Sequence, residues 1–407
     1  MLKNYLKVAF KVFLRRKFFT FISLFGIALT LIVLVVAVSL WDHVFGPHSP
    51  ETRPDRVFTV YSVHATGPNG NSSTGPAGYA FHERYVRTLK SPERVSVHSI
   101  FLPSISYRNG AKIKSWVKNV DAEFWRVFQF DFVEGGPFTA DDEKNGNRVA
   151  VINETTSRRF FGGASAIGQV VELDRQSYRV VGVVSNIPML RFTTFADAWT
   201  PISSRKSQQF KQEFENGMHF STILAKSAAD LPKIREEFAG MLTRVEFPDP
   251  RQFNKIEGEP KALLEAVSDE LTGGYLKVVI LVVIVLFLCL PTINLININV
   301  SRIRERASEI GVRKAFGASS WTLVGQFVIE NTLLTLIGGL LAFVGSQLVL
   351  RMVNASGWIP YAQLTLNPRI FLYGLALAAF FGLFSGVYPA WKMSRLHPVE
   401  ALRGGEQ

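Results

Sequence analysis

The side chains whose types and spacing could carry a function gather between positions 301 and 320, a highly charged stretch with helical spacing. Glu309 precedes Arg313 by four residues, the order in which an acid and a base pair favourably along a helix. Ile310 is the main apolar side chain of this stretch. Charges spaced in this way suit docking to a partner protein and do not form a reaction centre. The alternative is a solvated helical hairpin, which explains the charge but not the length of the helix.

Catalytic motifs are absent from the sequence. It contains no G-x-x-x-x-G-K-S/T phosphate loop, no H-E-x-x-H metal motif and no G-x-S-x-G nucleophile elbow. The seven histidines are scattered along the chain, and the single cysteine, Cys289, has no partner for an internal disulfide. The sequence therefore predicts no catalytic residue, no metal site and no cofactor held by this chain.

Four uncharged runs are each about long enough to cross a hydrocarbon core roughly 30 Å thick. They cover residues 18–41, 278–301, 331–350 and 370–391. Backbone groups in lipid must be paired within their own segment, so all four runs are expected to be helices. The first run is longer than the roughly 7–15 apolar residues of a signal peptide, and we expect it to stay attached as an anchor.

Lysine and arginine residues orient these spans. Residues 1–17 carry six basic side chains and no acid, the 301–320 stretch is basic, and the C-terminal tail adds Lys392, Arg395 and Arg403. These three segments fall on one side of a four-span chain, so that side is expected to be the cytoplasm. The net charge of +12 therefore reflects membrane orientation and does not indicate a surface that binds nucleic acid.

The region between the first two spans has the pattern of a folded α/β domain and lies outside by this orientation. Apolar periodicity predicts strands at 57–63, 95–102 and 220–226, and helices at 79–89 and 230–244. Between these elements we expect further strands at 148–152, 170–173 and 178–185. Asn153 is placed to cap a short helix that runs to Phe161. The pattern indicates one split unit, with a smaller β-rich unit inserted at about 112–205.

The fourth span carries small residues at every fourth position, a spacing that lets two helices approach closely. These residues are Gly374, Ala378, Gly382 and Gly386. We expect this face to pack against another membrane helix. In the second span, Pro291 and Asn294 make one end polar, which favours hydrogen bonds between helices over a substrate site.

The charged stretch resembles the signature of the FtsX-like permeases of ABC transporters, a family that includes MacB and the lipoprotein-releasing permeases. The resemblance rests on Glu305, Arg306, Glu309, Ile310, Gly311, Arg313, Lys314 and Gly317. The segment 388–403 is similar to the C-terminal motif of the same family, with His397 where an acid is more usual. Segments that resemble a MacB-type periplasmic domain lie at 116–130, 134–138, 148–154 and 180–184. The resemblance thus covers nearly the whole chain.

This resemblance implies a non-catalytic permease subunit. The signature residues would dock on a separate ABC ATPase subunit, which would bind the ATP and magnesium. Two permease chains, as a homodimer or a heterodimer, and two ATPases would form the complex, and ATP-driven closure would move the extracytoplasmic domains. Such a complex would export a peptide, a drug-like molecule or a lipoprotein, with a periplasmic adaptor and an outer-membrane channel left open as partners. The alternative is an FtsX-like transmembrane regulator that activates an extracytoplasmic partner and moves no cargo.

We therefore expect an α-helical integral membrane protein of the bacterial cytoplasmic (inner) membrane, with both termini cytoplasmic. It would have four transmembrane helices and a large extracytoplasmic α/β domain, made of a split porter-like unit and an inserted smaller β-rich unit. The expected order is 1–17 (cytoplasmic amphipathic helix), 18–44 (first span), 45–275 (extracytoplasmic domain), 276–300 (second span), 301–320 (coupling region), 321–350 (third span), 351–369 (short extracytoplasmic loop), 370–391 (fourth span) and 392–407 (cytoplasmic tail).

Overall fold

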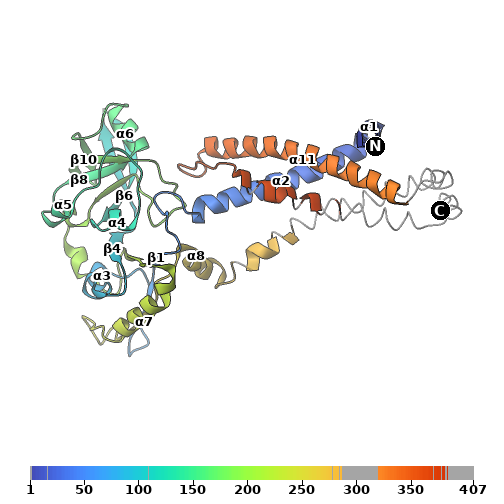
Figure 1. The fold of residues 1–407 in the computed structure, drawn as a ribbon. Helices are drawn as coiled ribbons and strands as arrows, with labels where there is room; N and C mark the ends of the chain where they lie inside the picture. Colours follow the sequence, from blue (N-terminus) through green and yellow to red (C-terminus); the bar gives the residue numbers. More distant parts are fainter. Residues whose placement is uncertain are drawn as a thin grey trace. The chain divides into compact units, whose positions relative to one another are not determined.

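The structure is a computed structural model in which the chain forms two compact units (Figure 1). It describes residues 2–15, 17–108, 110–276, 278–283, 285–286, 320–369, 371–376, 378–380 and 383. The helical unit comprises residues 1–41, 277–356 and 364–407, and the globular unit comprises residues 42–276 and 357–363. Most of the predicted coupling region, and most of the second and fourth predicted spans, lie outside the described residues.

The helical unit contains α1 (Leu2–Arg15), α2 (Lys17–Phe45) and α11 (Ser320–Ser356). Among the described residues, two stretches are long and apolar enough to cross a membrane, namely α2 and the Val328–Ser356 part of α11. They contain in full the uncharged runs 18–41 and 331–350, on which the first and third predicted spans rest. The helices α2 and α11 lie side by side in Figure 1, and Leu31 and Leu334 are buried in the apolar core of this unit.

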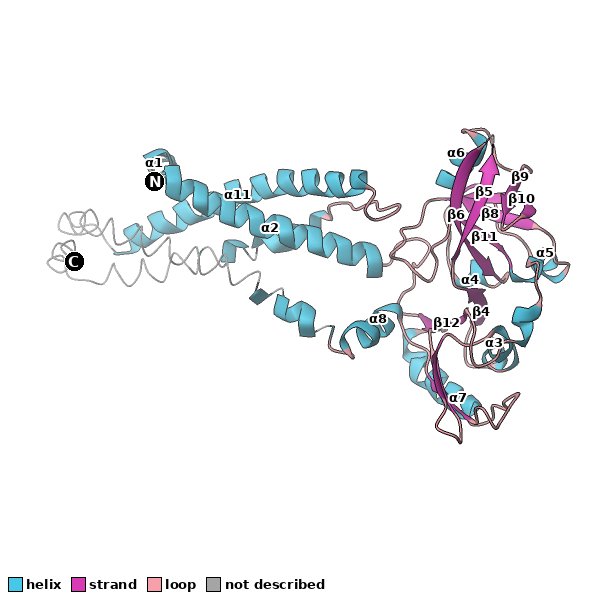
Figure 2. Ribbon diagram, turned by 180° about the vertical axis from the view of Figure 1, so that it is seen from behind, coloured by secondary structure: helices cyan, strands magenta, loops and turns pink. Residues whose placement is uncertain are grey.

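The globular unit is built around a ten-stranded mixed sheet in the order β1-β12-β4-β6-β11-β8-β10-β7, with β5 on β6 and β9 on β10 (Figure 2). The strands are β1 (Val57–Val60), β4 (Arg94–Ser99), β5 (Leu102–Arg108), β6 (Ala111–Val120), β7 (Phe132–Gly135), β8 (Val149–Asn153), β9 (Val170–Leu173), β10 (Gln176–Val184), β11 (Ala198–Pro201) and β12 (His219–Leu224). The pairs β8–β10 and β6–β11 are parallel. A small antiparallel sheet contains β13 (Lys255–Gly258), β2 (Val63–Thr66) and β3 (Ser72–Gly75).

Six helices complete this unit: α3 (Tyr79–Arg84), α4 (Phe124–Val127), α5 (Ala140–Lys144), α6 (Glu154–Phe161), α7 (Leu231–Leu242) and α8 (Leu263–Thr272). In α7 the apolar face predicted from helical periodicity is buried through Ile234, Phe238 and Met241. Asn153 caps α6 as predicted, because its side chain accepts a hydrogen bond from the Thr156 N–H.

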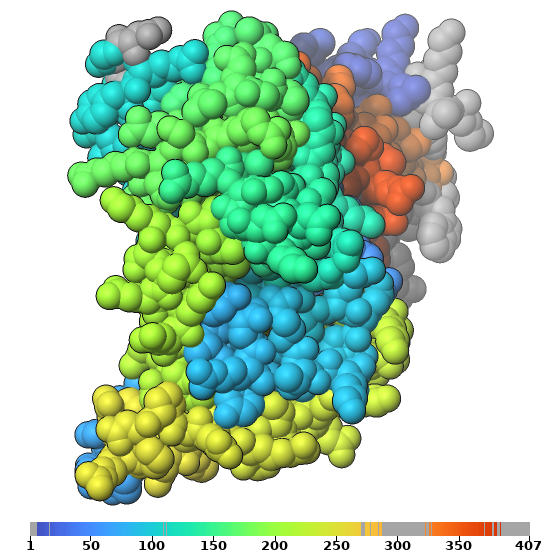
Figure 3. Space-filling model, turned by 90° about the vertical axis from the view of Figure 1, so that its left-hand side faces the viewer, coloured from blue at the N-terminus to red at the C-terminus, as the bar shows by residue number. Residues whose placement is uncertain are grey.

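The large sheet continues across the predicted start of the inserted unit near residue 112. Within it, β4 and β6 share a single residue pair, His98 with Val120. The strands β1, β12 and β4 share one apolar core with α3 and α7, whereas β8 and β10 pack with α6. On one face of the unit the segment near 80–95 (blue) lies beside the segment near 205–220 (yellow-green) in Figure 3, where the Gly78 N–H donates to the Phe214 carbonyl.

Candidate functional site

Residues 185–197, which join β10 to β11, form a segment that we name the connector. Its residues from Thr193 to Asp197 are buried, although they belong to no helix or strand. A buried segment of this kind must find hydrogen-bond partners elsewhere, because unpaired backbone groups are costly. The connector finds many of them in two distant stretches of chain within the globular unit, the residues that end and follow α2 and the loop that follows α11.

Arg191 of the connector holds the end of α2. Its Nε donates to the His43 carbonyl at 3.1 Å and its Nη2 donates to the Gly46 carbonyl at 2.9 Å. The last carbonyl groups of a helix lack partners within the helix and form the negative end of its dipole, which favours a cation there. A Cβ on Gly46 would lie 2.3 Å from the Asp42 carbonyl oxygen, so the chain can turn here only with glycine.

The same guanidinium forms an ion pair with Glu51, whose Oε2 lies 3.2 Å from Arg191 Nη1. Arg191 is 1% exposed and Glu51 is 9% exposed. The other carboxylate oxygen accepts a hydrogen bond from the Thr194 hydroxyl at 2.8 Å. Burial raises the pKa of Glu51, whereas Arg191 and the Thr194 hydroxyl favour the charged form. A buried pair with these added hydrogen bonds is costly to break, because the remaining charge has no partner.

A second buried cation fixes the middle of the connector. Lys118 of β6 is fully buried, and its Nζ donates to the Thr193 carbonyl at 2.6 Å and to the Phe192 carbonyl at 3.3 Å. Burial lowers the pKa of Lys118 to about 7, and the charge of Glu51 partly opposes this. The connector is therefore held by a group of three ionisable side chains that come from three separate parts of the chain.

The loop after α11 contacts the other end of the connector. The Tyr361 hydroxyl donates to Asp197 Oδ1 at 2.5 Å, and the Met189 N–H donates to the Pro360 carbonyl at 3.3 Å. Tyr361 has a φ of +61°, a left-handed conformation that a bulky side chain adopts only when its surroundings require it. Here the hydrogen bond to Asp197 and the ring of Phe195, 6.3 Å away between centroids, provide those surroundings.

A cavity of about 280 Å³ lies within the globular unit beside Glu51. It is lined mainly by apolar side chains, and its walls include Val44, Phe45, Val57, Ala262 and Leu263. Val44 and Phe45 end α2, while Leu263 begins α8, which leads toward the second predicted span. The cavity therefore lies between the end of α2 and the start of α8 within the globular unit.

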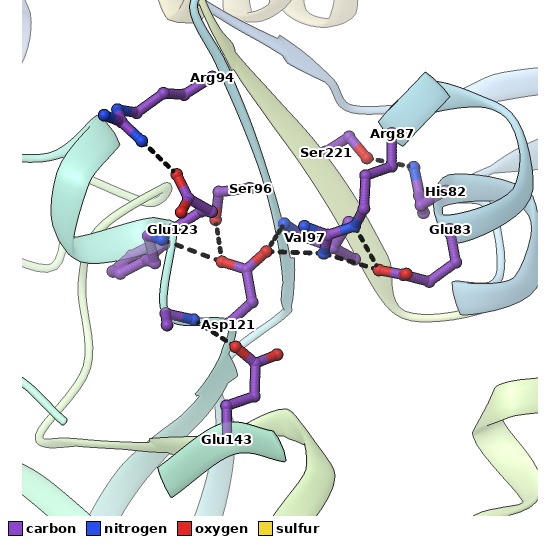
Figure 4. A network of polar contacts seen from close by, with 12 residues as sticks. His82, Glu83, Arg87, Arg94, Ser96, Val97, Asp121, Glu123, Glu143 and Ser221 are labelled. Carbon is purple, nitrogen blue, oxygen red and sulfur yellow. Dashed lines mark hydrogen bonds and ion pairs between the residues drawn. The ribbon is translucent and has the colours of Figure 1, made fainter. Parts of the chain in front are cut away.

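A second polar network, centred on Asp121 at the end of β6, joins the two parts of the large sheet (Figure 4). Its carboxylate is 1% exposed and accepts from Arg87 Nη2 at 2.8 Å, from the Val97 N–H at 2.7 Å and from the Ser96 hydroxyl at 2.7 Å. Burial raises the pKa of Asp121, whereas Arg87 and these hydrogen bonds favour its charged form. Nearby, burial raises the pKa of Glu143 to about 7. The network strengthens the place where β4 and β6 share one residue pair.

Three of the seven histidines lie together around β12. His82 contacts the Ser221 hydroxyl through Nδ1 at 2.7 Å, and His98 contacts the Thr222 hydroxyl through Nε2 at 2.9 Å. His219 stacks on the ring of Phe210. All three are at most 1% exposed, so they belong to the core. In the part of the chain that the structure describes, no group of three metal-ligating side chains occurs.

Of the site residues predicted from the sequence, the structure describes only Gly374 and Ala378. The coupling residues from Glu305 to Gly317, and Gly382 and Gly386, lie outside the described residues. Gly374 is buried, and a Cβ there would lie 3.2 Å from Leu34 Cδ2 of α2. Ala378 packs against the core of the helical unit.

Sequence reasoning missed a second set of small residues, in α11. A Cβ on Gly338 would lie 2.8 Å from Ile27 Cγ2 of α2, and Ala342 and Ser346 are fully buried. Their four-residue spacing is the signal that could have revealed them. The connector offered no such signal, because Arg191 and Glu51 are 140 residues apart.

The packing of α2 on α11 predicts that replacing glycine by alanine has opposite effects on stability at two positions of α11. Gly338→Ala is expected to destabilise the helical unit by about 1–3 kcal/mol, because the new methyl group overlaps Ile27. Gly325→Ala should stabilise α11 by up to about 1 kcal/mol, because nothing lies within 4 Å of a Cβ there and alanine favours helix. Thermal unfolding of the two detergent-solubilised variants provides the measurement. A loss of stability in Gly325→Ala, or none in Gly338→Ala, would contradict the packing of α2 on α11.

Within the described ranges, two helices long and apolar enough to cross a membrane are joined to a large α/β unit. The sequence model of the MacB-like periplasmic core domain matches residues 20–240, and that of the FtsX-like permease C-terminal domain matches residues 280–398. The chain therefore belongs to the MacB-like and FtsX-like permeases of ABC transporters.

The share of a relative's length that this chain covers differs between members of the family. The "Uncharacterized ABC transporter permease YknZ" of Bacillus subtilis is 24% identical over 417 residues, which include 99% of each chain. The "Macrolide export ATP-binding/permease protein MacB" of Chromobacterium violaceum is 27% identical over 73% of this chain, and that of Salmonella typhi is 28% identical over 70%. This chain spans only 44% and 42% of those two MacB proteins.

Solved structures similar to this chain include two domains from this family. The extracellular domain of YknZ from Gram-positive bacteria has a TM-score of 0.36 and 17% identity, and the match covers 46% of this chain and 92% of that domain. The periplasmic region of MacB from Actinobacillus actinomycetemcomitans has a TM-score of 0.37 and 14% identity, and the match covers 53% of this chain and 94% of that region.

Proposed function

We propose that this chain is the permease subunit of a MacB-like ABC transporter that exports a peptide, a drug-like molecule or a lipoprotein. A separate ATPase subunit would bind ATP and magnesium, and its closure would move the membrane helices and, through them, the globular unit on the outer side of the membrane. Family membership supports the ATPase partner, and the names of the MacB relatives support export. The two termini and the coupling region would lie in the cytoplasm, as the distribution of basic residues favours.

The observation that carries this proposal is the double attachment of the connector. Arg191 binds the end of α2, and Asp197 binds the loop that follows α11, so both stretches meet one buried segment between β10 and β11. A displacement of either stretch would therefore reach β10 and β11, the two strands that the connector joins, through hydrogen bonds and an ion pair. Such direct connections suit a protein that converts helix movement into domain movement.

The coupling region provides the first test. Glu309→Lys and Arg313→Glu should each weaken co-purification of the cognate ATPase at least about tenfold, because like charges would replace complementary ones at the contact. Arg302→Glu makes the same charge change outside the signature and should leave binding intact. Full ATPase binding by both signature variants would exclude this region as the docking site.

The alternative within the family is a regulator that activates an extracytoplasmic partner without moving cargo. The large globular unit between the first two spans favours transport, because a regulator needs only a partner-binding surface. Deletion of the gene separates the two functions. Lost export of a substrate supports the transporter, whereas unchanged export together with lost activity of an enzyme captured by residues 45–275 supports the regulator.

The assembly follows from the same proposal. A second permease chain, identical or diverged, would pair with this one in the inner membrane, and a periplasmic adaptor with an outer-membrane channel would complete an export path. Cross-linking of the membrane-embedded complex followed by mass determination would show whether two permease chains and two ATPases are present.

A further inference from the structure

A second cavity, of about 580 Å³, opens between two β hairpins and the segment that follows β11. Its walls contain polar and apolar side chains of the β5–β6 hairpin, the β9–β10 hairpin and residues 205–207. Figure 3 shows the green segment near 170–185 directly above the yellow-green segment near 205–220 on this face of the globular unit. The cavity is separate from the connector and from the cavity beside Glu51, since it shares no lining residue with either.

Arg205 supplies a positive charge to this cavity. Its guanidinium lies 4.4 Å from the ring centroid of Phe210, and its Nη1 lies 3.3 Å from His219 Nε2. Among the described residues no carboxylate forms an ion pair with this half-buried guanidinium, although Glu213 and Asp174 are near enough to favour its charged form and Asp174 lines the same cavity. Lys206, which is exposed, lies beside Arg205 on the same wall. Arg205 and Lys206 outnumber the single acid of the lining, Asp174, and a guanidinium held by an aromatic ring without an ion-pair partner is suited to bind an anion.

Gln176 supplies an unpaired hydrogen-bond acceptor to the same cavity. The residue is 7% exposed, and its Nε2 donates to the Tyr178 hydroxyl at 3.4 Å. Its Oε1 is buried and has no partner. Buried polar atoms are paired in the great majority of cases, so an unpaired one that lines a cavity points to a ligand with an N–H group.

Apolar side chains form the remaining wall. Leu102, Pro103 and Val117 line the cavity from the β5–β6 hairpin, and Leu102 and Pro103 are exposed. In β5 the usual pattern is reversed, because Ser104 and Ser106 are buried while apolar residues face out. An apolar group of a ligand would therefore find contact beside the cations.

We propose that this cavity binds the carboxyl-terminal end of a peptide. The carboxylate would lie at Arg205 and Lys206, a backbone N–H would donate to Gln176 Oε1, and an apolar last side chain would contact Leu102 and Val117. The carboxylate, the N–H and the apolar side chain of a peptide end thus match the cationic, hydrogen-bond-accepting and apolar walls of the cavity. Binding there requires neither ATP nor an ATPase, so it stands apart from the proposed transport function.

Three small probes separate the contributions of these groups in binding measurements on the full chain in detergent. Acetyl-leucine carries the carboxylate, the N–H and the apolar group, acetyl-leucinamide lacks the charge, and isocaproate lacks the N–H. Acetyl-leucine is expected to bind at least about tenfold more tightly than acetyl-leucinamide. It is also expected to bind at least about threefold more tightly than isocaproate. Equal binding of acetyl-leucine and its amide, or no binding of any probe, would overturn the proposal. Equal binding of isocaproate would overturn the assignment to a peptide end.

Two variants and one control locate the binding. Arg205→Gln should abolish the preference for the carboxylate, and Gln176→Met, of similar volume, should abolish the preference for the N–H. Arg175→Gln removes a neighbouring exposed cation that does not line the cavity, so both preferences should remain. If Arg205→Gln does not fold, Leu102→Glu, at an exposed position, should repel the carboxylate and reverse the first preference. Unchanged preferences in the folded variants would refute this site.

Discussion

Arg191→Met is expected to destabilise the globular unit by about 3–5 kcal/mol, the usual cost of removing one partner from a buried ion pair. The variant leaves Glu51 buried without its cation, and it leaves the carbonyl groups of His43 and Gly46 without their donor. Under the proposed function it should also stop export while ATP hydrolysis continues, because the end of α2 is no longer bound to the connector. Urea denaturation and an export assay with the reconstituted complex measure the two effects.

Matched variants separate the loss of charge from the loss of contacts. Arg191→Lys keeps the charge but offers one ammonium group in place of a planar fork, so it should restore only part of the stability. Adding Glu51→Gln to Arg191→Met removes the unpaired charge and should recover stability, although the contacts with α2 stay broken and export stays low. Arg179→Met, at an exposed position, should have little effect. Full export by a folded Arg191→Met variant would exclude the connector from coupling.

Acidification from pH 7 to pH 5 is expected to reduce the stability of the globular unit by up to about as much as Arg191→Met does. Burial lowers the pKa of His82 to about 4 and that of His219 to about 3, and it holds the pKa of His98 well below its usual value. An unfolded chain protonates these histidines near pH 6.5, whereas the folded chain does not. Each histidine therefore removes about 1.4 kcal/mol of stability per pH unit as the pH falls below about 6.5.

Other ionisable groups of the globular unit also change how its stability depends on pH. Burial raises the pKa of Glu143 to about 7, so the folded state gains a proton there before the unfolded state does, and this offsets about one of the three histidines. Burial also raises the pKa of Glu51 and of Asp121, which therefore act in the same direction as Glu143. Lys118, with a pKa lowered to about 7, acts mainly above neutral pH, where stability rises with pH. The net slope between about pH 6 and pH 5 is thus at most about 3 kcal/mol per pH unit.

The pH dependence of the urea midpoint measures the effect. His82→Gln and His98→Gln should each flatten the curve below about pH 6.5, because glutamine does not titrate. His64→Gln serves as the control, since this histidine lies outside the buried cluster, on β2, beside the Thr74 hydroxyl. A curve that stays flat from pH 7 to pH 5 in the parent chain would show that these histidines are not buried in the neutral form.

Periodicity predicted the regular elements whose apolar residues face the core. The helix α7 and the capped helix α6 follow from local spacing alone, and β9 was predicted with its observed bounds, 170–173. The strand β5 could not be predicted in this way, because its buried positions are serines. Ser106 donates to the Glu172 carbonyl and Ser104 accepts from the Asp174 N–H, so hydrogen bonds to the β9–β10 hairpin replace apolar packing there.

The candidate site was even less accessible to sequence reasoning. Glu51, Lys118, Arg191 and Tyr361 are each ordinary polar residues in their local context, and only the fold brings them to one segment. The family resemblance pointed to the coupling region because that signature is contiguous. A site assembled from four distant stretches of chain leaves no contiguous motif in one sequence.

The single residue pair between β4 and β6 has a mechanical consequence. A fully paired junction between two strands resists twisting through many backbone hydrogen bonds, whereas one pair offers little torsional stiffness. The resistance to rotation of one half of the sheet against the other therefore depends on side chains, chiefly the carboxylate of Asp121 and the guanidinium of Arg87. Substitutions at these two positions would tune how far the halves turn under load while leaving each half folded.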